Sequence, residues 1–192
     1  TGNTATLDGG ALFNGGGFRG KSSPTLTNVT FTGNRSAYGG GAMADVGSSF
    51  GDSSPSLTNV VFFNNSAGAN GGALFNNGGY SGKSSPSLTN VTFYSNTSAT
   101  RGGAICNIGS SGGDASETLT NAILWGNTAT QGDDQIGDSN AASTVNYSVV
   151  QGGWTGAGGS NSAEDPLFAD AATGNLNLLP GSPAIDGGTD SI

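Results

Sequence analysis

Residues 85–107 read SPSLTNVTFYSNTSATRGGAICN, and closely similar stretches recur along the chain at an interval of 31 residues. Leu88 and Asn96 of this stretch each belong to a column of four identical residues spaced by that interval. The two columns are Leu26, Leu57, Leu88 and Leu119, and Asn34, Asn65, Asn96 and Asn127. A constant period of this length is typical of a solenoid, in which each repeat buries its apolar side chains only by stacking on its neighbours.

Within one repeat, the residue types favour short strands separated by turns. Residues 87–93 are rich in β-branched and aromatic side chains, and residues 102–106 predict a second short strand. We expect Leu88, Val91 and Phe93 to point inward, with a bend near Asn90 because the first two are three residues apart. No segment has apolar residues at helical spacing. The fold class predicted is all-β: a right-handed parallel β-helix with coils of about 31 residues, the hand following from the rule for parallel crossovers.

The repeat divides the chain into three parts of one domain, residues 1–192. Residues 1–130 are predicted to form regular coils, and residues 131–164 degenerate coils. Residues 165–192 match no repeat and are expected to be an atypical C-terminal closing segment, which a solenoid needs at its end. Asn3 lies one period before Asn34, so the first coil begins in mid-repeat and should offer an edge for strand addition.

Several polar columns predict ladders along the stack. Asparagine side chains can donate and accept between coils, and so satisfy the backbone of the corners. Besides the column of Asn34, we expect this of a second column, Asn14, Asp45, Asn76 and Asn107. A column of alternating charge predicts a ladder of exposed ion pairs: Lys21, Asp52, Lys83 and Asp114.

An aromatic column is the candidate binding or packing face. Phe63, Tyr94 and Trp125 each follow an inward residue, so each should point outward. A row of exposed aromatic rings suits the faces of sugars or the surface of another molecule. The alternative is that other parts of the chain cover these rings. Rows of Thr and Ser around the Leu column also resemble the face of β-helical antifreeze proteins, although β-propensity accounts for the threonines.

Composition excludes several functions. The chain has five Lys and Arg, 13 Asp and Glu, a net charge of −8 and no His, so it is not expected to bind nucleic acid. No apolar run is long enough to span a membrane.

The single cysteine, Cys106, lies in a column with Phe13 and Phe75, which predicts a small buried hydrophobe rather than a reactive thiol.

Catalytic and cofactor motifs are not found either. No basic side chain lies together with carboxylates on one face of the repeat. We therefore expect no catalytic residues and no enzymatic activity. We also expect no cofactor and no metal, apart from a weak indication of Ca²⁺ where Asp133, Asp134 and Asp138 gather.

The motifs resemble known families. The FxxN steps at 31–34, 62–65 and 93–96, and the GGA steps ending at residues 11, 73 and 104, resemble repeats of the chlamydial polymorphic outer-membrane protein passengers. The tail from DPLF at 165–168 to GSPAIDGG at 181–188 is similar to the closing segment of bacterial choice-of-anchor Q β-helix proteins. The resemblance implies a secreted or surface-displayed right-handed β-helix of adhesin-like type, with no catalytic residues to transfer.

These observations predict an extracellular or cell-surface, structural or adhesin-like bacterial β-solenoid. Its coil ends favour self-association, and head-to-tail docking would build a filament. A glycan or another cell-surface ligand is the further partner expected. The alternative is a carbohydrate-binding or polysaccharide-active β-helix protein.

Overall fold

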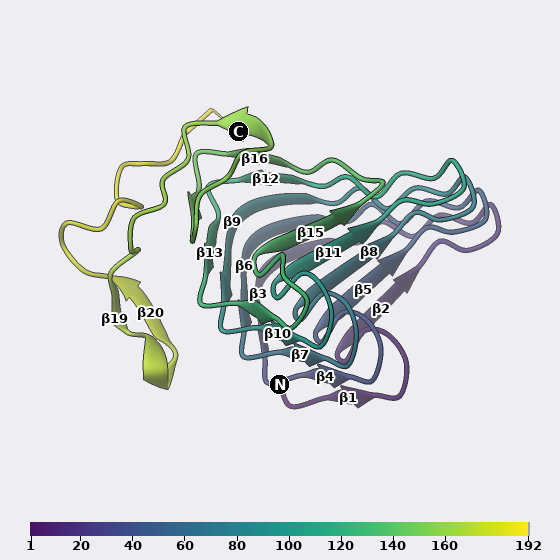
Figure 1. Cartoon of the computed structure of the whole chain (residues 1–192), viewed down its shortest axis with the longest axis horizontal. Coiled ribbons are helices and arrows are strands. Elements are labelled where there is room, and N and C mark those ends of the chain that lie inside the picture. Colours follow the sequence, from purple (N-terminus) through teal and green to yellow (C-terminus); the bar gives the residue numbers. More distant parts are fainter. Residues whose placement is uncertain (192) are drawn as a thin grey trace.

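The computed structural model describes residues 1–191, and its regular structure is almost entirely β. Three parallel sheets run along a stack of coils, with one or two strands of every coil in each sheet (Figure 1). In the first sheet, Thr4 pairs with Arg35, and the same 31-residue step continues to Thr128. The predicted parallel β-helix with 31-residue coils is therefore confirmed.

The first sheet contains β1 (Thr4–Ala5), β4 (Arg35–Ser36), β7 (Ser66–Ala67), β10 (Thr97–Ser98) and β14 (Thr128–Ala129). The second contains β2 (Leu12–Gly15), β5 (Met43–Val46), β8 (Leu74–Asn77), β11 (Ile105–Ile108) and β15 (Ile136–Ser139). The third contains β3 (Thr25–Thr32), β6 (Ser56–Phe63), β9 (Ser87–Tyr94), β12 (Thr118–Thr120), β13 (Ile123–Trp125), β16 (Thr144–Asn146), β17 (Val149–Val150) and β18 (Ala157–Gly159).

The long strands of the third sheet show how the repeat directs its side chains. Leu88, Val91 and Phe93 of β9 are buried, as predicted. Asn90 lies between them with a φ of +55°, a left-handed conformation that asparagine tolerates better than most residues. This bend resets the alternation of the strand, so that residues three apart point to the same side. Identical side chains of neighbouring coils then stack, and the rings of Phe62 and Phe93 are parallel with centroids 4.7 Å apart.

The main core runs the length of the stack between the three sheets. It combines the buried leucines of the third sheet with inward residues of the second, such as Met43, Leu74 and Ile105. Of the predicted Leu column, Leu57, Leu88 and Leu119 are fully buried, whereas Leu26 of the first coil is half-buried. Leu26 is more exposed because it has a neighbouring coil on one side only.

The two ends of the stack differ. At the first coil, β1, β2 and β3 each pair with one strand within the described residues, so their outer edges are open. At the last coil the repeat shortens: Thr118 pairs with Thr144, 26 residues later, and β16 then pairs with β18. The loop before β18 packs the side chain of Trp154 against the main core. Residues within 151–164 therefore close the core at this end.

The terminal segment takes a different place from the one expected of a closing segment. Residues 165–191 run beside the third sheet and include an antiparallel hairpin of β19 (Phe168–Asp170) and β20 (Asn175–Leu178), joined by a 3₁₀ turn at Ala171–Thr173 (Figure 1). Further along, the backbone N–H of Thr189 donates to Asn121 Oδ1 at 2.9 Å. The segment lies at the side of the stack because its half-buried apolar residues pack against the outward face of that sheet.

Candidate functional site

The first asparagine column forms a continuous buried ladder. Asn65 Nδ2 donates to Asn96 Oδ1 at 2.9 Å, and Asn96 Nδ2 donates to Asn127 Oδ1 at the same distance. Each Oδ1 also accepts from the backbone N–H of the preceding coil's asparagine. Asn65 Nδ2 and Asn96 Nδ2 donate in addition to the backbone carbonyls of Phe31 and Phe62. The ladder ends where Asn127 donates to Gln135 Oε1 at 2.7 Å. Asn34, Asn65, Asn96 and Asn127 therefore hold the corners of the coils.

The second polar column is also buried, but acids interrupt it. Asn14 Nδ2 donates to Asp45 Oδ1 at 2.9 Å, and Asn76 Nδ2 donates to Asn107 Oδ1 at 2.7 Å. Between these pairs, Asp45 Oδ2 and Asn76 Oδ1 have no hydrogen-bond partner in the described part of the chain, although the two residues are in register on β5 and β8. The column ends at Asp138, whose Oδ1 accepts from Asn107 Nδ2 at 2.7 Å.

Two carboxyl groups near this column are held in an apolar interior. Burial raises the pKa of Asp45 to about 8, against hydrogen bonds from Asn14 and Ser53 that lower it. Burial, followed by the Asp138 carboxylate, raises the pKa of Glu117 to about 8. Neither Glu117 oxygen has a partner of normal hydrogen-bond geometry within residues 1–191. Both acids are shielded from solvent, so neither is placed to act on an external substrate.

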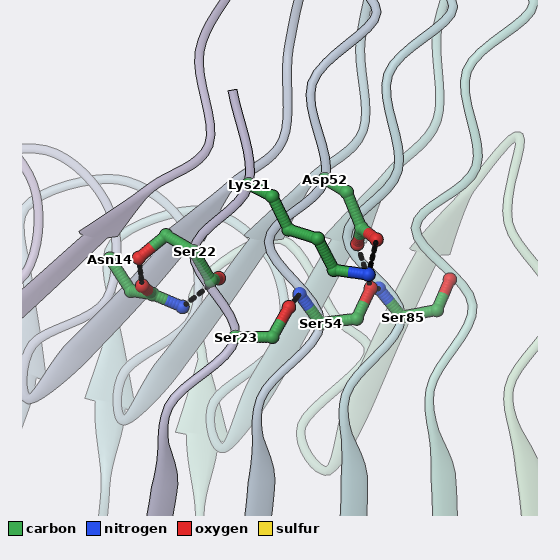
Figure 2. Close-up of polar contacts among 7 residues, drawn as sticks. All are labelled: Asn14, Lys21, Ser22, Ser23, Asp52, Ser54 and Ser85. Atoms are coloured by element: carbon green, nitrogen blue, oxygen red, sulfur yellow. Dashed lines mark hydrogen bonds and ion pairs between the residues drawn. The ribbon is translucent and has the colours of Figure 1, made fainter. Parts of the chain in front are cut away.

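The charged column follows the predicted register but not the predicted ladder of ion pairs. Lys21, Asp52, Lys83 and Asp114 form backbone bridges from coil to coil. Among the described residues, the one ion pair is Lys21 Nζ to Asp52 Oδ2 at 3.5 Å (Figure 2). The prediction of a continuous ladder is therefore wrong. Neighbouring hydroxyls bind the carboxylates instead: Ser54 Oγ donates to Asp52 Oδ1 at 2.6 Å, and Ser85 Oγ to Asp114 Oδ2 at 3.0 Å.

Serine side chains beside this column add their own links between coils. The backbone N–H of Ser54 donates to Ser23 Oγ at 3.2 Å, and that of Ser85 donates to Ser54 Oγ at 3.1 Å (Figure 2). On the interior side, Ser22 Oγ donates to Asn14 Oδ1. The loops between the second and third sheets are therefore tied to one another by side chains as well as backbone.

The candidate column of Phe63, Tyr94 and Trp125 lies on the outward face of the third sheet, and all three residues are half-buried. The Phe63 and Tyr94 rings stack with centroids 6.0 Å apart. Phe168 of β19 sets its ring edge against Tyr94 at 5.4 Å. The terminal segment thus occupies part of this face, and of the two roles expected for the column, the geometry supports packing.

A cavity of about 800 Å³ lies where the rest of the terminal segment faces the third sheet. Asn90, Asn121 and Asn161 line it from the sheet side, and Asp186 and Asp190 from the terminal segment. Its polar lining is neutral or acidic, which does not suit an anionic ligand. Asn121 is already bound to the terminal segment, since its Nδ2 donates to the Thr189 carbonyl at 2.9 Å.

The three aspartates considered for Ca²⁺ do not converge on one point. Asp138 is bound to Asn107 and Ser143, Asp134 accepts from the backbone N–H of Ala129, and Asp133 is exposed in a turn. In residues 1–191 no group of three or more His, Cys, Asp or Glu side chains could hold a metal ion. Cys106 is buried and free, and burial, followed by the Asp138 carboxylate, raises the pKa of its thiol to about 12. That thiol is therefore protonated and unreactive.

Three exposed aromatic residues were not predicted from the 31-residue columns. Phe18, Phe50 and Tyr80 lie on three successive loops between the second and third sheets, and their exposed fractions are 78%, 63% and 67%. Phe18 and Tyr80 are two periods apart, but Ser49 lies between them in the column and Phe50 is one position later. Because of this shift, a strict 31-residue spacing does not predict the row.

Comparison with known proteins bears on the repeat. The model of the Chlamydia polymorphic membrane protein repeat matches residues 28–42, 59–77 and 90–108. No curated protein and no solved structure gives a significant match to the chain. In the described residues no helix is long and apolar enough to cross a membrane. The repeat together with the β-solenoid fits a surface or adhesin-like protein. Three consecutive coils of this chain carry the Chlamydia polymorphic membrane protein repeat, as the resemblance of its FxxN and GGA motifs predicted.

Proposed function

We propose that this chain is a secreted or cell-surface scaffold of adhesin-like type, which presents loops and side faces to the outside of a bacterial cell. The observation that carries this proposal is the match of a surface-protein repeat to three coils that stack in register. The buried polar side chains support it, because they bind one another between coils and leave a rigid support for exposed loops.

Localisation tests this proposal directly. An antibody raised against the chain should label intact, unpermeabilised cells of the source organism, and brief protease treatment of those cells should remove the signal. Labelling that appears only after the cells are opened would overturn the proposal. An antibody against a cytoplasmic protein of the same cells is the control for cell integrity, because it should give no signal until the cells are opened.

We propose further that the chain is not an enzyme. Asp45 and Glu117, whose pKa values are raised toward neutrality, are buried in the interior, away from any external substrate. The competing function is a polysaccharide lyase or hydrolase. Incubation with a panel of acidic and neutral polysaccharides should release no reducing ends or unsaturated products, and reproducible release would favour the enzyme.

Self-association through the coil ends belongs to the same proposal. The open edges of β1, β2 and β3 can accept hydrogen bonds from a further coil, and a second copy could supply the outer edges of β14 and β15. Strand β18 already covers the third sheet at that end, so such a contact would use the first two sheets. Negative-stain electron microscopy over a dilution series should show filaments that shorten on dilution. Single short particles at every concentration would exclude this assembly.

A further inference from the structure

Three loops form a ridge that projects from the stack. The loops are residues 16–21, 47–52 and 78–83, which follow β2, β5 and β8; we call them the loop ridge (Figure 1). They are rigid for loops, because the backbone of each binds the next. Arg19 N–H donates to the Ser49 carbonyl at 3.1 Å, and Phe50 N–H donates to the Tyr80 carbonyl at the same distance. The backbone at their tips is therefore held in register from coil to coil.

The loop ridge carries a row of open aromatic rings. Phe18, Phe50 and Tyr80 come from three successive coils and are each more than 60% exposed. The Arg19 guanidinium lies 5.9 Å from the ring centroids of both Phe18 and Phe50, and so bridges two coils. A row of exposed rings on three successive loops marks a contact surface.

The backbone under these rings is unfavourable for aromatic residues. The φ angles of Phe18, Phe50 and Tyr80 are +32°, +64° and +54°, in or near the left-handed region where bulky side chains are rarely found. Glycine would relieve this strain, and the corresponding loop of the fourth coil has Ser111 and Gly112 there instead. Strain kept at exposed positions with no packing role points to a function for the side chains.

Charge also distinguishes the loop ridge from the rest of the molecule. It holds three of the five basic residues, Arg19, Lys21 and Lys83, but one of the 13 acidic residues, Asp52. Lys21 is paired with that aspartate. Arg19 and Lys83 form no ion pair in the described part of the chain, although Lys83 is in register with Asp114 of the next loop. The surface is therefore locally basic on an acidic protein, which selects an anionic ligand.

We propose that the loop ridge binds a linear acidic polysaccharide. Its sugar rings would stack on Phe18, Phe50 and Tyr80, and its carboxylate or sulfate groups would bind Arg19 and Lys83. The row favours a polymer with a short repeat, because the loops recur at the strand spacing of about 4.8 Å. Hydroxyls at Ser49 and Ser81, beside the rings, suit sugar hydroxyl groups better than lipid chains. This inference rests on the proposed surface function and names its ligand class.

The test uses the full chain and titration calorimetry with defined probes: an oligogalacturonate, a heparin oligosaccharide, a neutral cello-oligosaccharide and vesicles containing phosphatidylserine. We expect binding of at least one acidic oligosaccharide, weakened by added salt. The triple variant Phe18→Ala/Phe50→Ala/Tyr80→Ala should weaken it at least tenfold, and Arg19→Gln/Lys83→Gln should do the same. The matched control Tyr38→Ala removes an exposed aromatic elsewhere on the surface and should leave binding unchanged.

Several outcomes would overturn the inference. These are no binding of either acidic oligosaccharide, binding that the triple variant retains, and binding to the vesicles alone, which would indicate a membrane contact instead. Phe50→Tyr keeps the ring and should keep the affinity, so that a loss seen only in the alanine variants is not attributed to misfolding. Surface labelling of cells with no binding of acidic sugars would reject this inference and leave the proposed function intact.

Discussion

The two polar columns of this solenoid are both buried but differ in chemistry. In the column of Asn34, every side chain is an amide, and Asn34, Asn65 and Asn96 each donate to the next coil. In the column of Asn14, the carboxyl group of Asp45 interrupts the series and leaves unpartnered oxygens on itself and on Asn76. A ladder of identical amides satisfies itself, whereas an acid in the ladder does so only when it carries a proton.

The largest expected effect comes from breaking the complete ladder. Asn96→Ala removes bonds to Asn65, Asn127 and the Phe62 carbonyl at a fully buried position. We expect the free energy of unfolding to fall by about 4 kcal/mol, because several buried groups lose their partners at once. Chemical denaturation measures it. Asn76→Ala is the comparison: its Oδ1 has no partner to lose, so about half that effect is expected. Equal losses would contradict the difference between the columns.

The next effect concerns pH. Asp45 and Glu117 have pKa values near 8 in the folded chain, above the values of 3.8 and 4.5 expected when unfolded. The folded state thus binds protons more tightly, so this stabilisation is complete below about pH 4 and is lost as the pH rises through 8. We expect the free energy of unfolding to fall by about 2 kcal/mol between pH 7 and 8, about 1 kcal/mol from each acid. Urea denaturation at several pH values would detect it, and a rise in stability over that range would refute it.

Replacing the interrupting acid should make the second ladder resemble the first. Asp45→Asn supplies an amide that can accept from Asn14 and donate to the unpartnered Asn76 Oδ1. We expect a gain of about 1 kcal/mol at pH 8 and a weaker dependence of stability on pH. Glu117→Gln, outside the register of this column, should remove its own share of the pH dependence without completing the ladder. A loss of stability in Asp45→Asn at pH 8 would show that the carboxylate is needed.

The smallest effect should come from an exposed amide column, which tests whether burial gives the other two their importance. Asn90 Nδ2 donates to Asn59 Oδ1 at 3.1 Å in an exposed bend with a φ of +55°. Asn90→Ala should cost about 1 kcal/mol, chiefly because alanine disfavours this backbone conformation. Asn90→Gly accepts the conformation and should cost about half as much. Thermal unfolding of the two variants compares them, and a greater loss in the glycine variant would assign the effect to the amide.

The sequence predicted the periodic part of the structure well because the period is a local property of the chain. The 31-residue interval, the inward Leu88, Val91 and Phe93, and the buried Asn96 column all follow from residue type and spacing. Each coil repeats the environment of the one before, so the inward and outward positions predicted for residues 85–107 apply to the other coils as well. The resemblance of the FxxN and GGA motifs to the chlamydial repeat was recognisable for the same reason.

Tertiary structure alone decided what covers each face and which side chains meet. The position of residues 165–191 beside the third sheet, the contact of Phe168 with Tyr94 and the closing of the core by Trp154 join segments that share no period. Nor could spacing show that Ser54 and Ser85 bind the carboxylates of the charged column, or that Phe18, Phe50 and Tyr80 form one exposed row. A repeat sets the order of its coils through local chemistry, whereas contacts between non-repeating segments depend on the assembled surface.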